Sequence, residues 1–320
     1  LVRHHRAAAT RIDQDGGRID RLGLHRLRAG DAEGAVEPLL RAAEDEVLAR
    51  DVGEAARISG WLREALDALP RAVLPQARAR AHLLQATLHI LRGATDDADE
   101  DLACADELAR AHRWVDLQAR VALIRARRAI RQRRFDEALA QLASASKLAD
   151  EARDRTLSGR ARFRRGSLLL YLGRVDAAEV ELQQARPMAR SHPAHLAQLL
   201  MALARAATVR GEHDDARRLL REAEPWFRAA GSAWGPIAVR DHLAQLDRLD
   251  GLLDQAADGY RVVYENYLRL GLRQADIALL HHGLVRLAQG RHADARAELA
   301  HCVSAFRTWK APLQGSLAWA

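Results

Sequence analysis

Arginine is the residue type in this sequence best suited to bind a charged ligand. The chain contains 50 lysines and arginines, of which Lys147 and Lys310 are the only lysines. A guanidinium can engage a carboxylate or phosphate through two parallel hydrogen bonds. Arg80, Arg120 and Arg160 follow one another at intervals of 40 residues. Codon bias in a GC-rich genome is an alternative origin of the excess, so position must identify the arginines that bind.

The sequence lacks the patterns that support catalysis or cofactor binding. It contains no GxGxxG, no P-loop and no GxSxG segment. No nucleophile–base or acid–base arrangement can be assigned. We therefore predict that the chain is not an enzyme and holds no cofactor.

Histidine and acidic residues offer no convincing metal site. His192 and His195 flank Pro193, which predicts a connecting loop, and they lack cysteine or carboxylate partners at ligand spacing. His281 and His282 are adjacent on a predicted helix, so we expect one of them at a binding face rather than both on a metal. The acidic run at 96–101 is predicted to balance a helix dipole, with a cation or a basic partner as the alternative.

Composition predicts an all-α protein. Of the 320 residues, 48% are apolar, only 4% are aromatic and 29% are charged, and Ala, Leu and Arg dominate. The chain has no Val/Ile-rich strand runs, and no apolar run reaches the roughly 18 residues of a membrane span. Two cysteines, expected to be inert packing residues, indicate a reducing compartment, so we expect a cytoplasmic location. The net charge of +7 permits a nucleic acid, a membrane surface or an acidic peptide as partner.

The elements that must position the arginines come from an internal repeat. A glycine followed five residues later by an alanine occurs at Gly93, Gly173, Gly211, Gly251 and Gly290, and Arg133 begins a copy without the glycine. The alanines form the series Ala98, Ala138, Ala178, Ala216, Ala256 and Ala295, spaced 40, 40, 38, 40 and 39 residues apart. Residues at equivalent positions of successive copies are called a column below.

Further columns fix the register of the repeat. Small residues lie 12 positions before and 7 positions after most of these alanines, and a leucine usually lies 4 after. An aspartate 2 positions before is predicted to cap the second helix of a pair and to face its dipole. Small residues let antiparallel helices approach closely, and stacked pairs share a continuous core. The repeat therefore predicts an α-solenoid.

Small residues separated by 12 and then 7 positions resemble the tetratricopeptide repeat (TPR) pattern. The period near 40, the missing aromatic and the missing repeat-end proline depart from the usual repeat of about 34 residues. The resemblance implies a right-handed α-α superhelix of about seven helix-turn-helix pairs. The predicted pairs are 32–69, 76–111, 115–150, 155–190, 194–230, 234–270 and 273–308. We expect a linker or capping helix over 1–31 and the start of a truncated further repeat over 309–320.

The opening segments resemble the start of the helical repeat region in large bacterial signalling ATPases related to the maltose regulator, and in some serine/threonine kinases. The matching stretches are 25–31 and 35–43. The resemblance implies a sensor or partner-binding arm. It does not transfer ATPase or kinase activity, which would belong to a module outside this sequence.

The TPR resemblance also implies which residues line a ligand groove, because the first helix of each pair faces the concave side. The predicted groove residues are Arg80, Arg120, Arg127, Arg131, Arg160, Arg164, Tyr171, Gln198, Arg205, His242 and Arg248, with Asp241 and Gln245 beside them. Arg120, Arg127 and Arg131 share one helical face at about 100° per residue. By contrast, Arg125, Arg128 and Arg133 are expected on solvated faces.

Repeated guanidiniums in a groove favour a peptide or protein segment that is acidic, or a small anionic effector. Nucleic acid is not favoured, because aromatic residues are not interleaved with the basic ones. The leading hypothesis is a non-catalytic binding module of a larger regulatory protein. The alternative is a structural arm that forms oligomers by self-association, with its edge helices as the interface.

Overall fold

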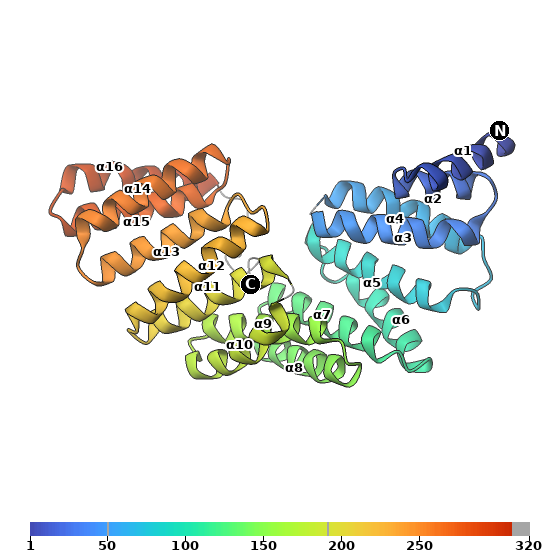
Figure 1. Ribbon diagram of the computed structural model, residues 1–320, viewed down its shortest axis with the longest axis horizontal. Coiled ribbons are helices and arrows are strands. Elements are labelled where there is room, and N and C mark those ends of the chain that lie inside the picture. Colours follow the sequence, from blue (N-terminus) through green and yellow to red (C-terminus); the bar gives the residue numbers. More distant parts are fainter. Residues whose placement is uncertain (50, 191, 309–320) are drawn as a thin grey trace. The chain divides into compact units, whose positions relative to one another are not determined.

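The protein is described by a computed structural model covering residues 1–49, 51–190 and 192–308, and α-helix is the only regular element in these ranges (Figure 1). The all-α prediction is confirmed. The chain forms two compact units, Leu1–Ala161 and Arg162–Ala320. The helices that begin in the first unit are α1 (Val2–Asp15), α2 (Ile19–Arg28), α3 (Ala32–Ala49), α4 (Val52–Asp67), α5 (Pro75–Arg92), α6 (Ala98–Ala111), α7 (Val115–Arg131), α8 (Phe135–Glu151) and α9 (Arg155–Tyr171). Those of the second unit are α10 (Val175–Ala189), α11 (Pro193–Val209), α12 (His213–Ala229), α13 (Gly235–Leu249), α14 (Leu253–Arg269), α15 (Gln274–Ala288) and α16 (His292–Thr308).

The amino-terminal segment contains two helices rather than one. α1 and α2 are joined at Gly16 and Gly17, and Gly23 of α2 approaches α3 so closely that a Cβ there would lie 2.6 Å from the Leu39 Cγ atom. The first 31 residues thus pack as a helical hairpin against the repeats. The predicted start of a further repeat at 309–320 lies outside the described residues.

The glycine column of the repeat marks the turn inside each pair. Gly93, Gly173, Gly211, Gly251 and Gly290 all have positive φ, between 72° and 86°. Glycine reaches this left-handed region without a Cβ clash, and it ends the first helix with backbone bonds to the last turn. Arg133 takes the same conformation, with φ 60°, in the copy that lacks the glycine. The sequence pattern and the backbone geometry therefore coincide at each of these turns.

The prediction that the aspartate column caps the second helices is wrong in its detail. The residues before α8, α10, α12 and α14 make no side-chain cap bond, and the aspartates lie in the first turn instead. From there they meet only the positive end of the dipole. Side-chain caps occur elsewhere: Asp51 accepts from the Glu54 N–H at 2.8 Å, and Asp154 accepts from the Leu157 N–H at 2.9 Å.

Small residues make the helix pairs tight. Ala98, Ala138, Ala178, Ala216 and Ala256 are each completely buried. At the column 12 positions earlier, a Cβ on Gly166 would lie 2.7 Å from the Leu182 Cγ and 3.1 Å from the Ala178 carbonyl oxygen. A larger side chain would therefore force α9 and α10 apart.

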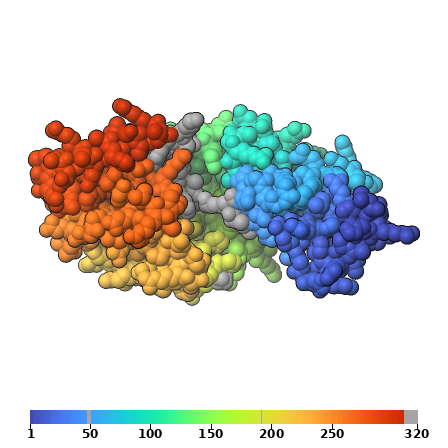
Figure 2. Space-filling model, turned by 90° about the horizontal axis from the view of Figure 1, so that it is seen from above, coloured from blue at the N-terminus to red at the C-terminus, as the bar shows by residue number. Residues whose placement is uncertain are grey.

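Each unit builds its core from neighbouring helices. In the first unit one apolar cluster joins α3, α4 and α5, and a second joins α5, α6 and α7. In the second unit one cluster extends over α10 to α13, and two smaller ones join α13, α14 and α15. Figure 2 shows this succession within the second unit, where the yellow, orange and red helices follow one another in chain order. No helix of the described ranges is both long and apolar enough to cross a membrane.

Candidate functional site

Arg80 on α5 is already engaged by two carboxylates. Its Nη1 lies 3.1 Å from the Glu37 Oε2 atom, and its Nη2 lies 2.7 Å from the Glu44 Oε2 atom. Burial opposes the charge of Arg80, but the hydrogen bonds and charges of Glu44 and Glu37 outweigh burial and raise its pKa. An incoming anion would have to displace these carboxylates, so Arg80 contributes little to a ready-made anion site.

Arg120 on α7 and Arg160 on α9 differ from Arg80. Arg120 is exposed and Arg160 is half-buried. Burial lowers the pKa of Arg160, and the positive charge of Arg120 lowers it further, while only the charge of Asp154 acts in the opposite direction. Within the ranges that the structure describes, no ion pair involves either of these guanidiniums. Two like charges are thus held near one another without a bound carboxylate.

The remaining arginines of α7 divide into two groups. Arg127 and Arg131, predicted for the groove, are half-buried. Arg125 and Arg128, predicted to lie on solvated faces, are instead ion-paired with Asp106 and Asp99 of α6. That prediction was wrong because the acidic residues of α6 face α7 and take up its arginines, whereas Arg133 is exposed in the turn as predicted.

In the second unit, the predicted site residues of α9 and α11 have varied environments. Arg164 and Gln198 are half-buried, and the side chain of Tyr171 is exposed at the end of α9. His192 precedes α11, whereas His195 lies within its first turn rather than in the predicted loop, because Pro193 occupies the first helical position.

The charge of Arg205 on α11 acts on His242 of α13. Arg205 is exposed to water, yet the surrounding protein lowers its pKa by desolvation. Burial lowers the pKa of His242 to about 4, helped by the charges of Arg205 and His281. His242 is therefore neutral at pH 7 and offers a hydrogen-bonding imidazole rather than a charge.

Asp241, next to His242, is a desolvated carboxylate. Burial raises its pKa to about 6. Its charge in turn contributes to raising the pKa of Tyr260 and Tyr267 on α14, for which burial is the main cause. Asp241 thus lies close to both phenols.

Arg248, Tyr260 and His281 form the other end of the same polar group. The Tyr260 and His281 rings lie 5.2 Å apart between centroids, at 53°. Burial raises the pKa of Tyr260 to about 12, and the neighbouring Arg248 opposes that rise. Burial also lowers the pKa of His281, with Arg248 adding to the effect. His282 instead points to Glu298, with 2.8 Å between Nδ1 and Oε2. The two histidines therefore diverge as predicted.

Tyr260 and Tyr267 are the site residues absent from the predicted groove, whereas His281 belongs to the histidine pair of which one member was expected at a binding face. Groove positions were assigned to first helices only, whereas the two tyrosines belong to α14, a second helix. The repeat register contains a signal that identifies them, since Tyr260 stands where most other copies have leucine.

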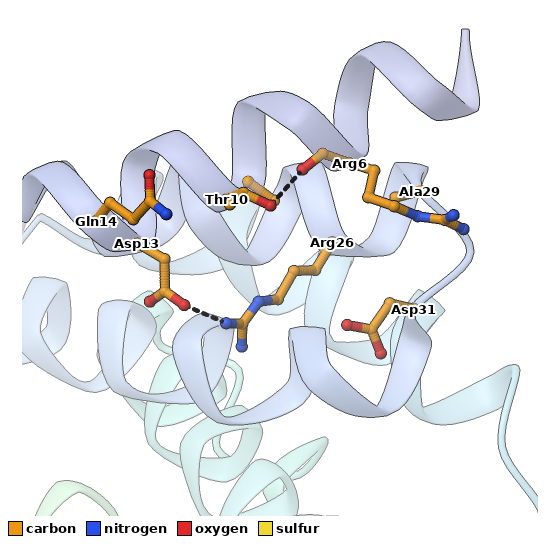
Figure 3. Close-up of a pocket in the computed structure, with 8 residues that line it drawn as sticks. Arg6, Thr10, Asp13, Gln14, Arg26, Ala29 and Asp31 are labelled. Carbon is orange, nitrogen blue, oxygen red and sulfur yellow. Dashed lines mark hydrogen bonds and ion pairs between the residues drawn. The ribbon is translucent and has the colours of Figure 1, made fainter.

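A separate open cleft of about 490 Å³ lies between α1 and α2 (Figure 3). It is lined by Arg6, Thr10, Asp13, Gln14, Arg26 and Asp31. The Arg26 Nη2 and Asp13 Oδ2 atoms lie 2.9 Å apart across it, so charges of opposite sign already satisfy one another. No predicted site residue lies in this cleft. Among the residues that the structure describes, no cluster of three or more His, Cys, Asp or Glu side chains is arranged to hold a metal ion.

Comparison with solved structures places the chain among TPR-like α-solenoids. It is similar to a Rap protein complexed with competence and sporulation factor, with 13% identity, a TM-score of 0.69, and coverage of 87% of this chain and 78% of the other. It is also similar to the regulator NprR in complex with its cognate peptide NprX, with 15% identity, a TM-score of 0.62, and coverage of 88% and 80%.

A third similar structure is a signal transduction ATPase with a tetratricopeptide repeat sensor from Pyrococcus horikoshii. The identity is 13% and the TM-score 0.69, and the match covers 91% of this chain but 44% of that one. The predicted resemblance to the repeat region of signalling ATPases is thereby confirmed for the fold. No protein-family model matches the sequence, and no curated protein matches it either.

Proposed function

We propose that this chain is a non-catalytic, peptide-binding solenoid that acts as the sensor or partner-binding arm of a signalling protein. Its ligand would carry an acidic group, which binds between the first helices α7 and α9 of the first unit. The observation that carries this proposal is the unbalanced pair Arg120 and Arg160.

The electrostatic argument starts from the cost of this pair. Arg160 is partly desolvated and faces a second positive charge, so the free protein holds it at an energetic penalty. A carboxylate between the two guanidiniums would remove the repulsion and form charge-assisted hydrogen bonds. Arg80 shows the same chemistry inside the protein, because Glu37 and Glu44 stabilise its charge.

Two of the similar structures support a peptide as ligand, since they are complexes with competence and sporulation factor and with NprX. The ATPase similarity supports a sensor role, because the part of that protein with this fold is described as a sensor. These proteins share the fold with this chain, and the ligand class is carried over as part of the proposal.

The proposal is tested with a fluorescein-labelled hexaglutamate peptide, with hexaglutamine as the uncharged reference. We expect the double variant Arg120→Glu, Arg160→Glu to bind hexaglutamate about 100-fold more weakly, because two charged hydrogen-bonding groups are lost. Fluorescence anisotropy measures the affinity and circular dichroism checks that helix content is unchanged.

The matched control is Arg63→Glu. Arg63 is exposed on α4, a second helix, so this substitution reverses a charge away from the proposed site. We expect less than a twofold change. Equal loss in Arg63→Glu, or unchanged affinity in the double variant, would reject the site.

Self-association is retained as a second candidate because of one observation. Large apolar side chains are exposed around the last helices of the second unit, at Leu249, Leu252, Leu268, Leu270, Leu284 and Leu287. Light scattering over a range of protein concentrations, with and without hexaglutamate, separates this candidate from ligand binding.

A further inference from the structure

The sixth helix pair departs from the repeat pattern at three positions that other copies keep apolar. Asp241 occupies a column that elsewhere contains Leu83, Leu123, Phe163, Met201 and Leu280. Tyr260 stands at a position where the other copies have a leucine, namely Leu102, Leu142, Leu182, Leu220 and Leu299. Tyr267 stands at a position where earlier copies have Ala109, Ala149, Ala189 and Phe227. The fold itself does not require polar groups there, because its other copies do without them.

These three departures come together in space. Ile237, Asp241, Ala244 and Arg248 share one face of α13 by their helical spacing. Ile237 packs in the apolar cluster that contains Tyr267, and Ala244 packs in the cluster that contains Tyr260. Asp241 lies between them on the same face, facing α14.

The fold leaves the polar atoms of this group unsatisfied. No ion pair or hydrogen bond of Asp241 is found within the described ranges of the chain. The Tyr260 side chain is 1% exposed, and its buried hydroxyl lies near the Arg248 guanidinium but makes no hydrogen bond of adequate geometry in those ranges. Buried polar groups are normally paired, so the Tyr260 hydroxyl, beside a half-buried carboxylate that no protein group of the described ranges bonds, favours a partner from outside.

The charges around this group favour a cation at Asp241. The titratable groups that face it are Arg205 on α11, His242, Asp247 and Arg248 on α13, Tyr260 and Tyr267 on α14, and His281 on α15. Both histidines have lowered pKa values, and Asp247 is paired with Arg217 at 2.8 Å. Arg248 affects the pKa of Tyr260 but is not among the charges that affect Tyr267, so it acts mainly at the Tyr260 end of the group.

We propose that Asp241, Tyr260 and Tyr267 form a binding site for a cationic group, the guanidinium or ammonium of a basic peptide side chain. The carboxylate supplies a charge-assisted hydrogen bond, and the Tyr260 and Tyr267 hydroxyls supply neutral acceptors. The inference rests on the proposed function only in taking the natural ligand to be a peptide. The site is complete within the second unit.

The test uses L-argininamide as the probe and isothermal titration calorimetry on the full chain. We expect the wild type to bind argininamide. Relative to the wild type, the affinity should be about tenfold lower in Asp241→Asn and about threefold lower in Tyr260→Phe. The matched control is Asp258→Asn on α14, the helix that carries Tyr260. The Asp258 side chain is 78% exposed, and the affinity of this variant should equal that of the wild type. Binding should fall as the pH decreases through about 6, because protonation removes the Asp241 charge.

Two results would overturn this site. One is an affinity for argininamide that does not change in Asp241→Asn while circular dichroism shows an intact fold. The other is preferential binding of N-acetylaspartate that is lost in Arg248→Ala, which would make the group an anion site. Hexaglutamate binding, measured on the same variants, should remain at the wild-type level, so failure here is distinguishable from failure of the acidic-ligand site.

Discussion

The first helices of the repeats carry different charges in the two units. The column of Arg80, Arg120 and Arg160 continues in the second unit as Gln198, Ala238 and Ile277. Conversely, the column of Leu83 and Leu123 in the first unit acquires Asp241 in the second. One unit therefore presents unbalanced positive charge, and the other presents a desolvated carboxylate beside two phenols.

The difference shows how a repeat protein separates folding from recognition. The alanine columns are buried to the same extent in both units, so they fix helix packing throughout. Charge varies at positions outside these alanine columns, where helix packing does not require a small residue. Even identical residues differ in effect, because Arg80 has Glu37 and Glu44 from α3 beside it while Arg160 has Arg120.

The largest effect on this difference between the units is expected from Asp241→Leu, which restores the apolar column. Because the folded-state pKa of Asp241 is raised to about 6, its ionised form penalises folding at neutral pH. We expect the variant to be more stable by about 3 kcal/mol at pH 7. Local stability of α13 and α14 can be measured by native-state hydrogen exchange.

The gain in stability should depend on pH in one direction. A carboxyl whose folded pKa is raised loses its penalty as the pH falls through about 6 toward its ordinary value, so the gain should shrink toward pH 4. Comparing variant with wild type at each pH cancels the contribution of His242, which is present in both. A gain that is constant between pH 4 and 7 would mean that packing, not charge, separates the two units at this position.

A smaller effect is expected from releasing Arg80. In Glu37→Gln, Glu44→Gln, the guanidinium loses both carboxylates and joins Arg120 and Arg160 as an uncompensated charge. Hexaglutamate affinity should rise about fivefold, measured by anisotropy. The control Glu33→Gln, Asp67→Asn removes the same two charges at exposed positions. If hexaglutamate affinity rises equally in the control and in the variant, net charge alone explains the result. Arg80 then does not contribute to the acidic-ligand site of Arg120 and Arg160.

The smallest expected effect is a difference between the two proposed sites in how strongly salt weakens ligand binding. Arg120 is exposed, whereas Asp241 is largely surrounded by protein, so counter-ions screen the first site more strongly. Raising NaCl from about 0.05 M to about 0.5 M should weaken hexaglutamate binding about tenfold but argininamide binding only about twofold. Calorimetry at both salt concentrations measures the two affinities. Equal salt sensitivity would mean that the two sites are equally exposed to solvent.

The fold followed from the sequence because it depends on local periodicity. The alanine columns, the turn glycines and their spacing predict helix pairs without knowledge of distant contacts. The aspartate column misled the prediction of caps, because in α8, α10, α12 and α14 the position two residues before the alanine lies inside the helix rather than before it.

The candidate sites were less predictable because side-chain partners depend on neighbouring helices. Nothing in the α5 sequence shows that Arg80 is held by Glu37 and Glu44, which lie about one repeat earlier. Tyr260 and Tyr267 could have been found by asking which columns change from apolar to polar. That question needs the register of the whole repeat rather than the sequence of one helix.

The division of the core into clusters of three or four successive helices has a thermodynamic consequence. Each described cluster can lose its packing while a distant one keeps it, because contacts reach only the next helix or the one after it. Heating should therefore melt the chain in blocks, with a calorimetric enthalpy larger than the van't Hoff value. A single Tm does not describe such a chain, and ligand binding at one block raises the melting temperature of that block alone.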